Sequence, residues 1–299
     1  MKQRGVVDGP FLKTGNALVF KVLLPVMIFD NTRKFGVASG FDWAPVVFVL
    51  VSTLALYVLY WAVVARTVRE RRDRGVMVQG LVRGNFVIYG TPLCVNLFGD
   101  TDEVRALTGI VAAVVVSTYN LISVIVLEYY GTNSGDGRVR AAQTARNIAR
   151  NPLIIGAVSG IAYSFLKTQT GFADLEFADR SIGYISRSAA PVALLFLGGE
   201  FKFGFLSLYR KQAAVVNIVR EVVAAAAVTA LAAALGFRGV ELGAVLCVFG
   251  SPIAVSSYQM AKMAGGNADL AAALVVTTTV VSCFTVFAMI AAAKAAGLF

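Results

Sequence analysis

Two short segments, each with a glycine, a hydroxyl residue and a proline in a row, are the parts of this chain best suited to form a binding site. They are Gly90-Thr91-Pro92 and Gly250-Ser251-Pro252, and each lies inside a long apolar run. Proline removes a backbone donor and clashes with the carbonyl one turn earlier, so we expect a helix to break or kink at each segment. In lipid, such a break persists only where it is buried or lines a wet cavity, and the positive ends of half-helices there favour an anionic group.

The two segments read as copies of one another. The stretch from Gly90 to Val95 recurs as the stretch from Gly250 to Val255, 160 residues later (252 minus 92). A weaker pair, Pro25-Val26 and Pro191-Val192, is 166 residues apart. Kinks that serve only packing are the alternative, because glycine and proline are common in membrane helices. Two copies at equivalent positions favour a binding site instead. The hydroxyl groups there, on Thr91, Ser251, Ser256 and Ser257, can bond a substrate or the broken backbone.

The composition requires a membrane setting for these segments. Hydrophobic residues make up 58% of the 299 residues, charged residues make up 15%, and the mean hydropathy is +0.73. Soluble proteins carry about 25% charged residues, so a soluble enzyme, a disordered chain and a disulfide scaffold are excluded. The chain has no histidine, and Cys94, Cys247 and Cys283 show no paired spacing. We therefore expect neither a disulfide nor a metal site.

Nine apolar stretches are predicted to cross the membrane as helices, which makes the fold class an all-α polytopic membrane protein. They are 14–31, 43–65, 76–98, 105–130, 151–168, 183–201, 212–236, 239–262 and 268–294. Arginine and lysine gather in alternate connectors, such as 66–74 and 138–150, whereas 99–105 and 167–180 are richer in carboxylates. By the positive-inside rule, the amino terminus is cytoplasmic and the carboxyl terminus lies outside, in the inner or plasma membrane. The net charge of +10 is thus a topology signal, and no nucleic acid partner is expected.

Each repeated motif recurs five predicted spans later. Because five is odd, the two copies run through the membrane in opposite directions, which is typical of inverted-topology repeats. We expect a first repeat in 1–130, a cytoplasmic linker in 131–150 and a second repeat in 151–299. The fifth span, which opens at Asn151-Pro152, has no counterpart in the first half, so the first helix of the first repeat is expected to be absent. A start assigned too late, a truncated chain and a protein that works with nine spans all remain open.

Several motifs follow one another in a particular order from about residue 10 onward. They are Leu18-Val19-Phe20 through Leu24-Pro25, Arg83-Gly84-Asn85 followed by Gly90-Thr91-Pro92, Asn151-Pro152-Leu153-Ile154, Ala190-Pro191 through Leu197-Gly198, Ser251-Pro252-Ile253-Ala254-Val255, and Gly265-Gly266 before the last span. In this order and spacing the chain resembles the auxin efflux carrier family of membrane transport proteins.

The resemblance implies ten spans in two inverted five-helix repeats, similar to bile-acid symporters and sodium–proton antiporters. It further implies that the fourth and ninth family helices are broken by proline and cross at the substrate site. On this view the spans that hold Pro92 and Pro252 are the crossing pair, and Asn85 faces the site. A neutral amide offers both donors and an acceptor to a carboxylate or a ring, so this role is chemically sensible.

Some polar side chains inside the spans depart from the apolar pattern. Asn120 lies in the fourth span, where packing between helices and lining of the site are both open. Lys21 is expected to snorkel to the interface. Arg187 is expected to be an interfacial anchor, with a place on an anion path as the alternative. Arg220 and Glu221 are expected to satisfy one another or another helix.

The leading functional hypothesis is a carrier of small organic anions, such as dicarboxylates or auxin-like acids, that works by alternating access. The alternative is a sodium- or proton-coupled symporter or antiporter, although Glu241 is the single acidic residue in the two crossing spans. An enzyme is not expected, because histidine and a carboxylate cluster are missing. No cofactor is expected, the coupling ion is left open, and the partners are the anion and the lipid bilayer, with a homodimer left open. The expected substrate-binding residues are Asn85, Gly90, Thr91, Pro92, Asn120, Gly250, Ser251, Pro252, Ser256 and Ser257.

Overall fold

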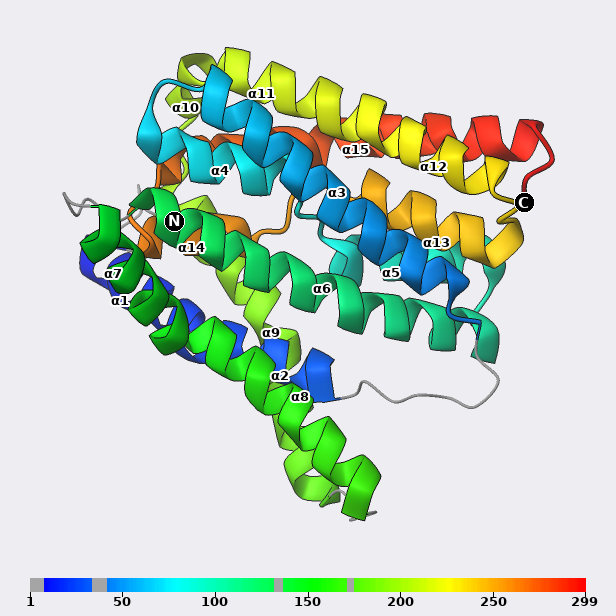
Figure 1. The fold of residues 1–299 in the computed structure, drawn as a ribbon, viewed down its shortest axis with the longest axis horizontal. Coiled ribbons are helices and arrows are strands. Elements are labelled where there is room, and N and C mark those ends of the chain that lie inside the picture. Colours follow the sequence, from blue (N-terminus) through cyan, green and yellow to red (C-terminus); the bar gives the residue numbers. More distant parts are fainter. Residues whose placement is uncertain (1–7, 34–41, 132–136, 171–174) are drawn as a thin grey trace.

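The computed structural model describes residues 8–33, 42–131, 137–170 and 175–299, and every regular element within these ranges is a helix (Figure 1). The remaining residues, which include the charged Lys2, Arg4 and Lys34, lie outside the described residues. Within the described ranges, six helices are long and apolar enough to cross a membrane. The predicted all-α polytopic membrane fold is therefore confirmed.

These six helices correspond to six of the predicted spans. They are the continuous helix α1 (Gly9–Leu18), η2 (Val19–Leu23) and α2 (Leu24–Arg33); α3 (Ala44–Thr67); α6 (Asp102–Gly131); α9 (Glu176–Glu200); the continuous helix α11 (Arg210–Val216), η4 (Asn217–Ala224) and α12 (Ala225–Ala234); and α15 (Ala268–Ala295). The segments η2 and η4 are wider, π-helical turns within them.

The other predicted spans are shorter or interrupted helices. One is α8 (Pro152–Thr170). A second consists of α4 (Arg71–Val82), the π-helical η3 (Phe86–Gly90) and α5 (Thr91–Phe98), and a third of α13 (Gly239–Gly250) and α14 (Ser256–Met263). The connecting helices α7 (Gly137–Arg150) and α10 (Gly204–Leu208) complete the described chain.

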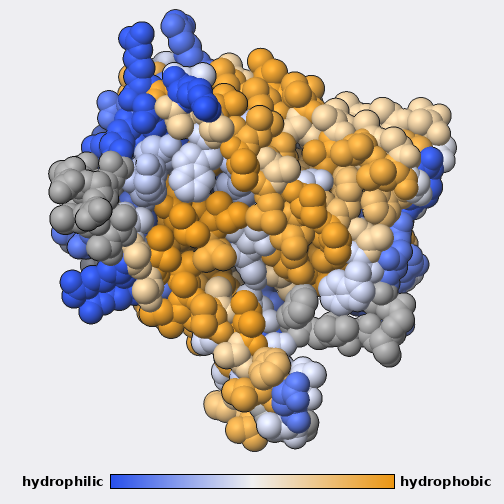
Figure 2. Space-filling view, in the orientation of Figure 1, coloured by the Kyte–Doolittle hydropathy of each residue, from blue (hydrophilic) through white to orange (hydrophobic). Residues whose placement is uncertain are grey.

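Apolar residues form a broad band across the protein, and hydrophilic residues gather at the left and right ends of the view in Figure 2. On the more basic face, the Arg72 side chain donates to the Gly265 carbonyl at 3.1 Å. On the opposite face, the Gly239 amide donates to the Leu298 carbonyl at 3.1 Å, and the rings of Phe98 and Phe299 lie 5.4 Å apart. Among the described residues, the connectors at Arg72 and Gly265 thus lie together on one face, and those at Phe98 and Gly239 lie with the last residues on the other.

The helices form two layers, and each half of the chain contributes to both. The three-helix layer consists of α1–α2, α8 and α9, and lies below the crossing layer, which consists of α3 to α6 and α10 to α15, in Figure 1. Small residues allow close packing inside the three-helix layer: a β-carbon on Gly156 would lie 2.6 Å from the Pro25 carbonyl oxygen. Close backbone approach at glycine is a common way for helices to associate in lipid.

The first interruption lies at a different place from the one predicted. Helix α4 ends at Val82 and the chain is extended at Arg83, whereas Pro92 is the second residue of α5 and follows η3 without a gap. The π-helical turn before Pro92 absorbs the missing donor and the bulk of the ring. Of the predicted break or kink at Pro92, the break is therefore wrong, because the helix is interrupted at Arg83–Asn85 instead. The second interruption, between α13 and α14, contains Pro252 as predicted.

Candidate functional site

The two interruptions meet inside the protein. Gly84 and Ile253 pair as an antiparallel bridge, and the backbone amide of Asn85 donates to the Pro252 carbonyl at 2.8 Å. The Ile253 amide donates to the Thr278 hydroxyl in α15 at 3.2 Å. Backbone groups freed by the breaks are thus partnered by protein, which a break at membrane depth requires.

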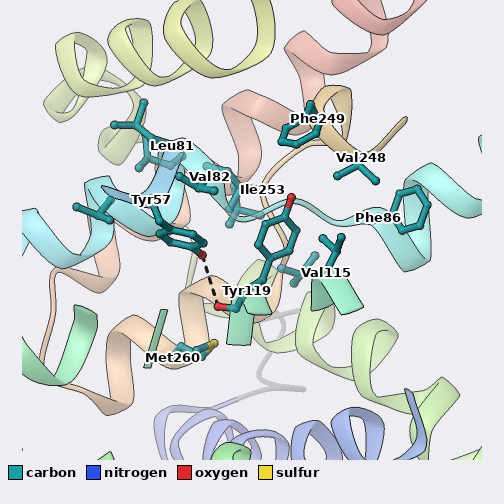
Figure 3. Packing of buried hydrophobic residues seen from close by; sticks show 14 of the residues in the cluster. Tyr57, Leu81, Val82, Phe86, Val115, Tyr119, Val248, Phe249, Ile253 and Met260 are labelled. Atoms are coloured by element: carbon teal, nitrogen blue, oxygen red, sulfur yellow. Dashed lines mark hydrogen bonds between the residues drawn. The ribbon is translucent and has the colours of Figure 1, made fainter. Parts of the chain in front are cut away.

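Apolar side chains surround this crossing. Ile253 is 1% exposed and lies among Val82, Tyr119 and Phe249 in Figure 3. The Tyr57 hydroxyl donates to the Tyr119 carbonyl at 3.5 Å and lies 3.0 Å from the Ser123 hydroxyl. The packing fixes the position of the two extended segments, because close-packed interiors leave little freedom for a shift.

Four helix ends of two kinds come together at the crossing. Helices α4 and α13 end there, whereas the helix from Phe86 to Phe98 and α14 begin there. The amino-terminal end of a helix carries partial positive charge and the carboxyl-terminal end partial negative charge. Both beginnings line one cavity, through residues 85–88 of the first and 254–256 of the second.

This crossing cavity lies between the two layers. Its other walls come from α2, α6 and α9, through Leu24, Met27, Asn31, Val116, Tyr119, Ala190 and Ala193. The cavity volume is about 40 Å³, which is room for roughly three water molecules. A molecule of the size of a dicarboxylate therefore enters only after the walls move apart.

Arg83 supplies the charge of the crossing cavity. Its side chain is 3% exposed, and its guanidinium donates to the Asn120 side-chain oxygen and to the Ser256 hydroxyl, both at 2.7 Å, and also contacts the Met260 sulfur. All three partners are neutral, and no carboxylate pairs with Arg83 among the described residues. A buried cation without a counter-ion is costly, which makes Arg83 a candidate for a functional residue.

A wider cavity lies next to the crossing cavity on the less basic face. It has a volume of about 580 Å³, is lined by residues of α5 and α6 that include Thr91, Val95 and Arg105, and shares Asn31 and Val87 with the crossing cavity. The Asn31 amide nitrogen is buried and has no partner among the described residues. The two cavities therefore adjoin one another at the side chains of Asn31 and Val87.

The predicted site residues divide between these places. Asn85 and Ser256 line the crossing cavity, and Thr91 lines the wider one. Gly90 and Ser251, one from each repeated motif, meet at the crossing, because a β-carbon on Gly90 would lie 2.9 Å from the Ser251 hydroxyl oxygen. Glycine is required there for the close approach.

The other predicted residues line neither cavity. Gly250, Pro252 and Ser257 are buried at the crossing, Asn120 is buried and orients Arg83, and Pro92 is exposed. For Asn120, where packing and site lining were both open, the structure shows a third role as a partner of the cation. The expected pairing of Arg220 with Glu221 is confirmed, since Arg220 Nε lies 3.0 Å from the Glu221 carboxylate.

Arg83 belongs to the Arg83-Gly84-Asn85 motif, but it was not among the substrate-binding residues expected from the sequence. The signal that identifies it is an arginine inside an apolar span, which in a membrane protein marks a functional position by default. No group of three or more cysteine or acidic side chains suited to a metal ion occurs within the described ranges.

A polytopic helical protein in which two interrupted helices cross beside a charged cavity has the architecture of a membrane transporter. The family profile described as "Membrane transport protein" matches residues 3–290. The chain therefore belongs to this family, the auxin efflux carriers that the motifs resembled. It is also similar to an "uncharacterized transporter" of Methanothermobacter thermautotrophicus, with 22% identity over 94% of this chain and 89% of that protein. The family is one of transporters and not of enzymes.

Proposed function

We propose that this chain is a secondary carrier of small organic anions, of the dicarboxylate or auxin-like class, and that the anion binds to Arg83 in the crossing cavity. The observation that carries the proposal is a buried guanidinium whose described partners are all neutral. A bound carboxylate supplies the missing charge and accepts hydrogen bonds in the fork geometry that guanidinium favours. Carboxylate-bearing cargo is therefore the substrate class.

Two further features support an anion at this position. The positive ends of two half-helices, at Phe86 and Ser256, border the same cavity as Arg83. Asn85, which is half-buried and lines the cavity, adds an amide that can bond a carboxylate. Cation, helix ends and amide all attract the same kind of ligand.

The movement that we propose is alternating access between the two layers. The crossing cavity lies between them and is too small for cargo in this conformation, and the wider cavity adjoins it on the less basic face. Rocking of the crossing layer against the three-helix layer opens the cavity to one face and then to the other. The proposal includes two inverted repeats, in 1–130 and 151–299, and an inner or plasma membrane location with the amino terminus cytoplasmic and the carboxyl terminus outside.

Uptake by proteoliposomes tests the proposal. Purified protein is reconstituted, and uptake of labelled succinate and of labelled indole-3-acetate is measured for the wild type, R83Q, R83K and R187Q. Arg187 is the matched control, because it is exposed and its guanidinium donates to the Gly183 carbonyl of its own helix at 3.1 Å. Loss of one charge-assisted hydrogen bond costs about 1.5–3 kcal/mol, so we expect KM of R83Q to rise at least tenfold.

Stability separates a binding role of Arg83 from a structural one. A buried cation without a counter-ion destabilises the empty protein, so R83Q is expected to melt at the same temperature as the wild type or higher while its KM for uptake rises. R83K keeps a point charge and should retain part of the uptake. An unchanged KM in R83Q contradicts the role of Arg83, and absence of carboxylate uptake by the wild type contradicts the proposed function.

A further inference from the structure

The carboxyl-terminal ends of two half-helices also meet at the crossing. Helix α4 ends at Val82 and α13 ends at Gly250. The last carbonyls of a helix lack partners within it and carry partial negative charge. Away from water, these groups need a compensating cation or donor.

Arg220, in the π-helical segment η4, fills this need for both helices. Its side chain is 3% exposed. One guanidinium nitrogen donates to the Ser251 carbonyl, directly after α13, and a second donates to the Gly80 carbonyl in the last turn of α4 at 3.4 Å. The third nitrogen donates to Glu221 at 3.0 Å. One cation thus bridges the negative ends of both half-helices.

The surrounding backbone leaves room for this cation. A β-carbon on Gly84, the residue that pairs with Ile253, would lie 3.2 Å from Arg220 Nη2. Glycine therefore allows the guanidinium to approach the crossing itself. Glu221 is fully buried, and its second carboxylate oxygen has no partner among the described residues.

The oxygens around Arg220 are of the kind that bind sodium. In carriers with interrupted helices, unwound carbonyls and the carboxyl-terminal ends of half-helices coordinate the coupling ion. Hard cations prefer carbonyl and carboxylate oxygens, and the Ser251 and Gly80 carbonyls together with Glu221 provide both.

We infer that Arg220 is a built-in cation that occupies the position of a coupling sodium ion, so that transport by this chain requires no sodium. The inference rests on the proposed carrier function and specifies its coupling. It separates the roles of the two buried arginines at the crossing: Arg83 lies beside the positive helix ends and binds an anion, whereas Arg220 lies beside the negative ends and replaces a cation.

Cation-dependent melting tests the inference without a substrate. The melting temperature of the purified protein is measured in sodium chloride and in N-methylglucamine chloride at equal ionic strength, for the wild type, R220M, R220K and the control R187M. The wild type, R220K and R187M should melt alike in both salts. R220M should melt about 3 °C higher in sodium at ten times its dissociation constant, because sodium enters the vacated oxygen site.

A double variant identifies the site. R220M/E221Q lacks the carboxylate and should lose the sodium response that R220M gains. Sodium-dependent uptake or melting of the wild type overturns the inference, as does a folded R220M with no sodium response. If R220M does not fold, the wild type and R220K decide, because any sodium response in either one overturns it. If the wild type moves no carboxylate, the carrier function fails, and the melting comparison still decides the role of Arg220.

Discussion

Replacement of Gly156 by alanine tests the close packing of the three-helix layer. A β-carbon at Gly156 in α8 would lie 2.6 Å from the carbonyl oxygen and 3.1 Å from the α-carbon of Pro25 in α2. Ordinary contacts begin near 3.4 Å, so α2 and α8 must separate by about 0.8 Å. The obstructing atoms belong to the backbone and cannot rotate away. Overpacking of this kind costs about 1–3 kcal/mol.

The matched control is Gly198→Ala in α9. A β-carbon there meets nothing within 4 Å, so the variant receives the same change without the clash. Alanine favours a helix over glycine by about 1 kcal/mol, and this gain cancels when the two variants are compared. Each kcal/mol of lost stability lowers the melting temperature by about 2–4 °C, so we expect G156A to melt about 5 °C below G198A.

Thermal unfolding in detergent, followed by circular dichroism, measures the difference. Gly160→Ala provides a second clash in the same interface, since its β-carbon would lie 2.8 Å from the Phe29 carbonyl oxygen. Both variants should lose stability, whereas G198A should lose none. If G156A melts within about 1 °C of G198A, the two helices do not pack as described, and the three-helix layer is wrong.

Two further predictions concern the crossing layer. Lys262 in α14 pairs with Glu200 in α9 at 2.6 Å and joins the two layers on the basic face. The pair is partly exposed and worth about 1 kcal/mol, so K262Q should make separation of the two layers easier. A cysteine placed at the cavity residue Ala193 should then be labelled from the basic face several-fold faster in K262Q than in the parent protein. Equal labelling rates contradict the idea that the ion pair holds the two layers together. T278V leaves the backbone amide of Ile253 without its acceptor, so we expect it to lower the free energy of unfolding by about 1–3 kcal/mol, measured by thermal unfolding. The control is T168V, at an exposed position where no buried group is left unpaired, and we expect no loss of stability from it.

The spans were readable from the sequence because lipid imposes a simple rule. Each crossing needs about 20 apolar residues, and most charges lie in the connectors, so length and charge together place the six long helices, although α9 begins at Glu176, before the predicted 183. The break at Pro252 was also predictable, since it combines glycine, serine and proline in one turn. Both inferences depend on local chemistry, which the sequence contains in full.

The position of the first break was not readable in the same way. Pro92 has the same chemistry as Pro252, yet the helix continues through it because η3 widens the turn that precedes it. The chain opens at Arg83–Asn85 instead, where Gly84 pairs with Ile253 across the crossing. That choice is made by a partner segment from the other half of the chain, and local sequence holds no information on where that partner lies.

The two buried arginines at the crossing, Arg83 and Arg220, illustrate the same limit and account for the selectivity that we propose. Arg220 is balanced by Glu221 and by the negative ends of two half-helices, so it adds no free charge to the crossing. Arg83 is held by neutral groups beside the positive ends of the other two, so the empty crossing cavity carries one uncompensated positive charge among the described residues. A single carboxylate neutralises that charge at the moment when the walls close around it. Because burial of a paired guanidinium in lipid costs far less than burial of an unpaired one, we expect the loaded carrier to be the form that rearranges most readily, whereas a neutral molecule of the same shape leaves the penalty in place.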